Sequence, residues 1–196
     1  MAAQKLEFQK AMQDTSLEWT ALFIGLFLDY YVPGYPTYVK IAPFSVDVKN
    51  NAAAIPGSGD RPLHFTHTWD VGKFIVPLLG LEKWERKYFI SGDIKTWNEV
   101  LAVAEQVKGV KFDVTYDSAE KLATGQVTEL PIYKEVYPLL GGEEAKPMLF
   151  GMLALIGTWY TQGWYDFGEG TFLNTLFPEV KAVGLKEAME RGLSGK

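Results

Sequence analysis

The sequence of 196 residues contains no cysteine and only two histidines. Without thiols, a disulfide scaffold, a cysteine nucleophile, thiolate zinc sites and iron–sulfur clusters are excluded. Basic residues are in the minority, because 19 Lys and Arg stand against 24 Asp and Glu and give a formal net charge of −5. Since no net basic field is available to hold a phosphate backbone, we expect no direct nucleic-acid partner.

Long hydrophobic runs are also lacking. The longest, at residues 19–28, lies between Glu18 and Asp29 and is about half of the roughly 20 residues that a membrane-spanning helix needs. Residues 1–13 carry charges and lack the apolar region of a signal peptide. We therefore expect no membrane partner and a cytoplasmic location, with the nucleus as the alternative.

Three common catalytic motifs are missing. The sequence has no Gly-x-Gly-x-x-Gly phosphate loop, no Gly-x-Ser-x-Gly nucleophile elbow, and no tyrosine four residues before a lysine. The two histidines, His64 and His67, are three residues apart. On a strand such a spacing points the side chains to opposite faces, so we expect no metal site.

What the sequence does contain is an alternation of strand and helix patterns. Helices are expected at residues 5–13, after the Thr96–Glu99 capping box, after a second capping box at residues 117–120, and within 148–164. Another, with Asp70 as its N-cap, is expected to reach Leu79 and end at Gly80, and to be short or kinked because Pro77 lies inside it. Strands are expected at 20–27, 52–55, 62–66, 87–91 and 111–116. This alternation predicts an α/β fold.

The strand at residues 20–27 is apolar on both faces, which is typical of the interior of a parallel sheet. An interior strand needs a neighbour on each side, yet only one short helix precedes it. The pattern is that of a chain that begins within a fold.

Two further features leave alternatives open. Lys5 shares a helix face with Phe8 and Met12, and we expect this face to pack inward. At its edge the Lys5 amine can act as a general acid or base or bind phosphate, or its stem can snorkel over the apolar face near a frayed terminus. Several aromatic residues can line a ligand cavity or belong to the core. They are Tyr30, Tyr31, Tyr35, Tyr38, Trp159, Tyr160, Trp164, Tyr165 and Phe167.

The order and spacing of several short motifs resemble one family from end to end. The motifs are Lys5 with Trp19-Thr20 and Gly25-x-Phe27, Asp70-Val71-Gly72, Phe89 to Asp93 followed by Trp97-Asn98-Glu99, and Leu173-Asn174 with Phe177-Pro178-Glu179. The family is that of the NmrA-like and isoflavone reductase-like proteins, atypical short-chain dehydrogenase/reductases, with the fungal branch as the best match.

The resemblance implies a fold and a domain arrangement. The expected fold is the C-terminal part of a Rossmann-type NmrA-like fold, with a remnant parallel sheet and a small α+β substrate-binding portion. Residues 1–196 would form a single domain that lacks its N-terminal glycine-rich half. Within it, residues 1–50 would end the Rossmann sheet and residues 51–196 would be mainly substrate-binding.

The resemblance also implies a site. Lys5 falls on the family's conserved lysine, a general base and cofactor contact. The segment Gly25, Leu26, Phe27, Leu28, Asp29 and Tyr30 matches the loop that passes the nicotinamide of NADP. The reductases have Asn and Cys where this chain has Gly25 and Leu26. Asp70 is interpreted as a structural helix cap.

The function implied by the family is an NAD(P)-dependent oxidoreductase of the isoflavone reductase type that acts on a small organic substrate. Without the glycine-rich half, the chain by itself is expected not to bind the cofactor. The alternative is a non-enzymatic NADP-sensing or partner-binding regulatory protein of the NmrA type, in which case the partner is another protein. A third reading is a degenerate product without activity.

Overall fold

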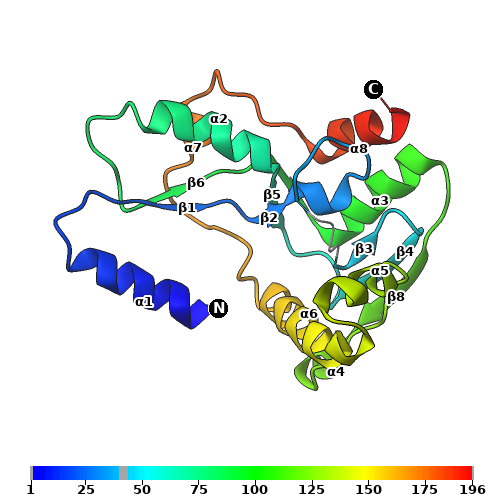
Figure 1. The fold of residues 1–196 in the computed structure, drawn as a ribbon. Coiled ribbons are helices and arrows are strands. Elements are labelled where there is room, and N and C mark those ends of the chain that lie inside the picture. The colour runs from blue at the N-terminus through cyan, green and yellow to red at the C-terminus, as the bar shows by residue number, and fades with distance from the viewer. Residues whose placement is uncertain (1, 40–43, 196) are drawn as a thin grey trace.

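A computed structural model describes residues 2–39 and 44–195. Within these ranges, short strands form three small sheets that are flanked by helices (Figure 1). Two of the sheets contain parallel pairs in the part of the chain where the sequence predicts a parallel sheet. The α/β class predicted from the alternation of patterns is confirmed.

The first two sheets are built around one chain segment. Strand β1 (Ala21–Phe23) pairs in parallel with β6 (Lys87–Phe89). Strand β2 (Leu26–Phe27) pairs in parallel with β5 (Leu63–Thr66), which pairs in turn with the antiparallel β7 (Asp93–Lys95). Both N-terminal strands therefore find their parallel partners beyond residue 50.

The prediction of one continuous, fully buried strand at residues 20–27 is wrong in two respects. Gly25 adopts a left-handed φ of 67°, which ends β1 and directs β2 into a different sheet. The residues of β1 are only partly buried, and Phe23 remains 39% exposed. Among the described residues, β1 pairs with a strand on one side alone.

The third sheet lies on the other side of the molecule (Figure 1). It joins β3 (Val46–Asp47) antiparallel to β4 (Ala52–Pro56), which is parallel to β8 (Asp113–Asp117). Every residue of β4 is buried, because α3 (Trp97–Lys108) and α6 (Lys146–Thr161) both contact this strand. The strands expected near 52–55, 62–66, 87–91 and 111–116 are thus all present.

The remaining helical elements connect and cover these sheets. They are α1 (Ala2–Gln13), η1 (Leu28–Tyr31), α2 (Thr68–Leu78), α4 (Ala119–Ala123), α5 (Tyr133–Val136), η2 (Tyr137–Leu140), η3 (Glu143–Ala145), α7 (Leu173–Leu176) and α8 (Leu185–Ser194). None of the described helices is both long enough and apolar enough to cross a membrane.

The helix N-termini agree only in part with the capping residues predicted from the sequence. The Thr96–Glu99 capping box is confirmed, because the Thr96 hydroxyl accepts from the Glu99 N–H and the Glu99 carboxylate accepts from the Thr96 N–H. The capping box expected at residues 117–120 is wrong, because Ser118 is the N-cap of α4 and its hydroxyl accepts from the N–H of Lys121, which has no carboxylate to return the bond. The prediction that Asp70 caps α2 is wrong, since His67 is the N-cap and Asp70 lies in the first turn.

Buried side chains gather in three clusters. The largest surrounds Trp97, Tyr31 and Phe65, between β5, α3 and α8. A second packs α6 against β4 and α5, and a third packs α2 against β6 and α7. Helix α1 lies apart from all three (Figure 1). The expectation that its apolar face packs inward is wrong, because Phe8 is 66% exposed.

Candidate functional site

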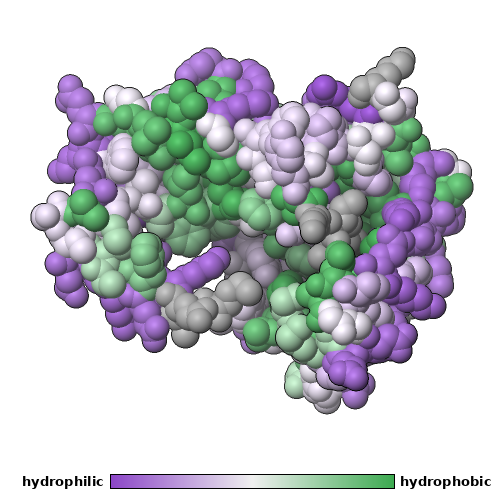
Figure 2. All heavy atoms as spheres, in the orientation of Figure 1, coloured by the Kyte–Doolittle hydropathy of each residue, from purple (hydrophilic) through white to green (hydrophobic). Residues whose placement is uncertain are grey.

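A pocket of about 710 Å³ lies between α1, β1 and the loop that follows α6. Figure 2 shows the molecule hollowed above α1, with apolar residues gathered on the upper wall of the hollow. Its lining comprises Lys5, Phe8, Gln9, Met12, Trp19, Thr20, Ala21, Leu22, Phe23, Ile24, Gly25, Trp164, Tyr165 and Phe167.

One wall of the pocket is a single face of α1. Lys5, Phe8, Gln9 and Met12 follow the i, i+3, i+4, i+7 spacing that places side chains on the same side of a helix. The shared face that the sequence predicts for Lys5, Phe8 and Met12 is therefore present. It lines a hollow instead of packing onto the sheet, and it brings the one lysine of the pocket lining to its rim.

A second wall is formed by β1 and the turn that ends it. Gly25 follows the carboxyl end of this parallel strand, the place where ligands bind in open α/β sheets. A β-carbon on Gly25 would lie 2.0 Å from the carbonyl oxygen of His64. Together with the positive φ, this close approach requires glycine at the position.

Two polar groups of this wall are left without protein partners. The Trp19 indole nitrogen and the Thr20 hydroxyl are buried, and neither makes a hydrogen bond to any described residue. Both residues line the pocket. A buried donor without a protein partner marks a position where a ligand group or water completes the hydrogen bonding.

The third wall is aromatic. Of the nine aromatic residues that the sequence left between cavity and core, Trp164, Tyr165 and Phe167 line the pocket. Tyr31 and Tyr160 belong to the core, whereas Tyr38 is almost fully exposed. Burial raises the pKa of Tyr165 to about 12, so this phenol stays protonated and remains a hydrogen-bond donor at neutral pH.

The other residues of the predicted cofactor loop do not line this pocket. Leu26 faces a separate small cavity shared with Tyr165, and Leu28 lies in the core. Phe27 and Tyr30 are half-buried, with their rings edge to face. Of the seven residues expected at the site, the structure thus brings Lys5 and Gly25 together on one pocket.

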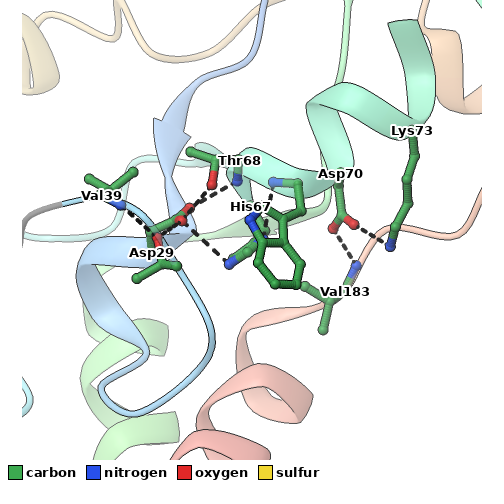
Figure 3. Close-up of polar contacts among 9 residues, drawn as sticks. Asp29, Val39, His67, Thr68, Asp70, Lys73 and Val183 are labelled. Carbon is green, nitrogen blue, oxygen red and sulfur yellow. Dashed lines mark hydrogen bonds and ion pairs between the residues drawn. The ribbon is translucent and has the colours of Figure 1, made fainter. Parts of the chain in front are cut away.

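Asp29 does not line the pocket, and its carboxylate contacts neighbouring residues of the chain (Figure 3). Its carboxylate accepts hydrogen bonds from the hydroxyls of Thr37 and Thr68 and from the Thr68 N–H. Burial raises the pKa of this carboxyl, but these hydrogen bonds outweigh burial and bring the pKa below its ordinary value. Every contact of this carboxylate shown in Figure 3 is thus with the protein's own chain.

The residues around Asp29 explain how α2 begins. His67 lies 3.4 Å from the Asp29 carboxylate, and its Nδ1 accepts from the Trp69 N–H at the helix start. Asp70, in the first turn of α2, accepts from the Val183 N–H at 2.8 Å and pairs with Lys73 (Figure 3). The structural role expected for Asp70 is therefore real, although it is a tether to the C-terminal segment and not a cap.

The pocket wall rests on residues that sequence reasoning did not connect. His64 contacts Ser91 and the adjacent residues Asp166 and Phe167, so these contacts join three separate parts of the chain, that of His64 included. No local motif joins these positions, so the sequence held no signal for them. Within the described residues, no three of the His, Asp and Glu side chains are grouped as metal ligands.

The chain is similar to known proteins in sequence and in fold. No protein-family model matches the chain. The chain is similar to the oxidoreductase BOA1 of Botryotinia fuckeliana, with 32% identity over 175 residues that make up 87% of this chain and 53% of that protein. It is also similar to the oxidoreductase swnN of Metarhizium robertsii, with 30% identity, 90% of this chain and 52% of that protein. The chain spans about half the length of these relatives.

Solved structures of several reductases share its fold. An isoflavone reductase aligns with a TM-score of 0.70 at 17% identity and covers 96% of this chain and 57% of its own. AtPrR2 with NADP⁺ and (+)pinoresinol aligns with a TM-score of 0.70 at 18% identity, over 96% and 55%. Leucoanthocyanidin reductase from Vitis vinifera, in a complex with NADPH, gives 0.65 at 14% identity, over 98% and 60%.

The chain is thus a relative of fungal oxidoreductases and has the fold of the isoflavone and pinoresinol reductases, which is the NmrA-like, atypical short-chain dehydrogenase/reductase fold. The family resemblance and the fold class that the sequence predicts are confirmed.

Proposed function

We propose that this protein is a reductase of the isoflavone reductase type, which uses NADPH to reduce a small organic substrate. The observation that carries the proposal is that Lys5 and Gly25 lie on two walls of one pocket. The family resemblance assigns both residues to the reaction centre. The two fungal relatives are oxidoreductases, which supports the same class of activity.

The pocket fits the nicotinamide end of the cofactor. Its volume of about 710 Å³ lies within the range of roughly 300–1,000 Å³ that is typical of small-molecule sites. Trp164 and Phe167 offer flat ring surfaces, and the buried Thr20 hydroxyl lacks a partner among the described residues. These groups suit a planar ring that carries a carboxamide. When bound, NADPH supplies the hydride.

The chain's own residues then divide the remaining work. Lys5 is exposed at the rim of the pocket and is free to donate a proton to a substrate oxygen, where its positive charge also stabilises developing negative charge. Gly25 lets the end of β1 approach the backbone of His64 in β5, because glycine adds no side chain between them. The aromatic wall excludes water from one side of the pocket.

The proposal is tested by following NADPH oxidation by the protein with a panel of carbonyl and enone substrates. We expect Lys5→Ala to lower kcat/KM by about 10²–10⁴, the contribution typical of a general acid or base. Lys10→Ala is the matched control, because Lys10 is exposed on the same helix and lies outside the pocket lining. Equal turnover by the two variants would remove Lys5 from the reaction.

The same experiment separates the enzyme from the regulatory alternative. A wild-type protein that binds NADPH and turns over none of the substrates is what a non-enzymatic NADP-sensing protein requires. A protein that neither binds NADPH nor oxidises it contradicts both functions for this chain, and is the outcome expected if cofactor binding needs a glycine-rich loop, which residues 1–196 do not contain.

A further inference from the structure

His64 lies directly behind the aromatic wall of the pocket. It belongs to β5, and its side chain is only 5% exposed. Its imidazole stacks on the ring of Phe167 with centroids 4.2 Å apart and an interplanar angle of 11°. Phe167 also stacks on Phe89 of β6, at 4.8 Å and 22°. The wall therefore rests on two strands through one phenylalanine ring.

The polar contacts of His64 define the tautomer of its neutral imidazole. Its Nδ1 lies 2.9 Å from the Ser91 hydroxyl, and that hydroxyl donates its proton to the Asp93 carbonyl at 3.1 Å. Because the hydroxyl proton is thus engaged, we assign the His64 proton to Nδ1, which donates to Ser91. The Asn174 side chain bonds both the N–H and the carbonyl of Ser91 at 2.9 Å, which fixes this acceptor in place.

The second ring nitrogen faces the loop. Nε2 of His64 lies 3.9 Å from a carboxylate oxygen of Asp166, which stands between Tyr165 and Phe167 on the wall. From β7, Lys95 pairs with the Asp93 carboxylate at 3.0 Å, and that carboxylate also accepts from the Leu185 N–H. From β6, the Lys87 amine lies over the Phe89 ring. Asp166 is therefore the carboxylate that faces the imidazole.

We propose that His64 is a positioning residue whose neutral imidazole holds the wall formed by residues 164–167 closed over the pocket, and that protonation of this imidazole releases the wall. As a determinant of substrate retention, this role rests on the proposed function. The part of the proposal in which His64 holds residues 164–167 closed, called the latch below, depends only on the contacts of His64 with Phe167, Ser91 and Asp166.

The direction of the pH effect follows from proton linkage. With the wall closed, burial lowers the pKa of His64 below its ordinary value of 6.5, and Asp166 offsets part of this effect. Lifting Phe167 and its neighbours exposes the imidazole, so its pKa returns toward the ordinary value. The open state then binds the proton more tightly, and acidification through this range favours opening.

Hydrogen–deuterium exchange of the segment 162–170, followed from pH 8 to pH 5 and corrected for intrinsic exchange rates, tests this latch without any substrate. We expect exchange in the wild-type protein to rise by roughly threefold or more on acidification. Exchange in α3 serves as the internal reference for the rest of the fold.

Three variants make the result specific to His64. His64→Asn keeps an amide donor toward Ser91 but does not titrate, so its exchange should be independent of pH. Asp166→Asn removes the charge that favours the imidazolium, so its acid-induced rise should exceed that of the wild type. Ser91→Ala removes the acceptor of the neutral ring and should raise exchange even at pH 8.

A flat profile in the wild type, or equal pH dependence in the wild type and His64→Asn, would overturn the latch. If turnover is found, the latch further requires that acidification raise the KM of the wild type more than its kcat falls, and that His64→Asn lose this rise. Because the exchange measurement needs neither cofactor nor substrate, a failure of the proposed function leaves its outcome readable.

Discussion

The backbones of Gly25 and His64 approach so closely that a β-carbon on Gly25 would lie 2.0 Å from the His64 carbonyl oxygen. Gly25 lines the pocket at the end of β1, and His64 in β5 stacks on Phe167 of the aromatic wall. The two halves of the candidate site therefore meet at one glycine.

Gly25→Ala tests this contact. The variant adds strain at a positive φ to a clash with backbone atoms that cannot move independently, so we expect a loss of about 2–5 kcal/mol in the free energy of unfolding. Urea denaturation measures it. Gly151→Ala is the control, because Gly151 lies within α6 and a β-carbon there meets no atom within 4 Å. The control should gain about 0.5–1 kcal/mol. Equal effects of the two substitutions would show that the contact is unimportant.

The buried carboxylate of Asp29 should make stability depend on pH. Hydrogen bonds from Thr37 and Thr68 hold its pKa below 3.8, so its contribution is present above that ordinary value and is lost as pH falls through the lowered one. We expect Asp29→Asn to lower the free energy of unfolding by about 1–3 kcal/mol at pH 7. The difference from the wild type should shrink below about pH 4.

Asp14→Asn provides the matched comparison for Asp29, since Asp14 is exposed just after α1. The denaturation midpoint of Asp14→Asn should stay near that of the wild type at both pH 3 and pH 7. A loss of stability in Asp29→Asn that is equally large at pH 3 and pH 7 would contradict the role assigned to the charge.

The capping box of α3 predicts a smaller and purely local effect. Thr96→Ala removes the acceptor of the Glu99 N–H, which should cost about 0.5–2 kcal/mol in the free energy of unfolding. Thr96→Ser keeps the hydroxyl and should stay within a few tenths of a kcal/mol of the wild type. Chemical denaturation of both variants checks this, and equal destabilisation would mean that the hydroxyl does not cap the helix.

The parts of the fold that sequence predicted well depend on neighbours along the chain. The box at Thr96 and Glu99 is correct because its two hydrogen bonds join residues three apart. The shared face of Lys5, Phe8 and Met12 follows from helix geometry alone. Such features need no knowledge of the tertiary structure.

The parts that sequence missed depend on distant contacts. At Gly25, where β1 ends, the carbonyl of His64 leaves no room for a side chain. The N-cap of α2 is His67, which lies beside Asp29. The aromatic wall lines the pocket with Phe167 stacked on both His64 and Phe89, which are far from it in the sequence. Each of these pairs brings together residues from separate elements, and no local pattern encodes the pairing.

Binding of NADPH in the pocket beside Lys5 is tested most directly by chemical protection. Treating the protein with acetic anhydride, with and without NADPH, and quantifying each modified lysine by mass spectrometry compares Lys5 with Lys10 on the same helix. We predict that NADPH lowers the acetylation of Lys5 several-fold and leaves that of Lys10 unchanged. Acetylation of Lys5 that is the same with and without saturating NADPH would contradict NADPH binding in this pocket.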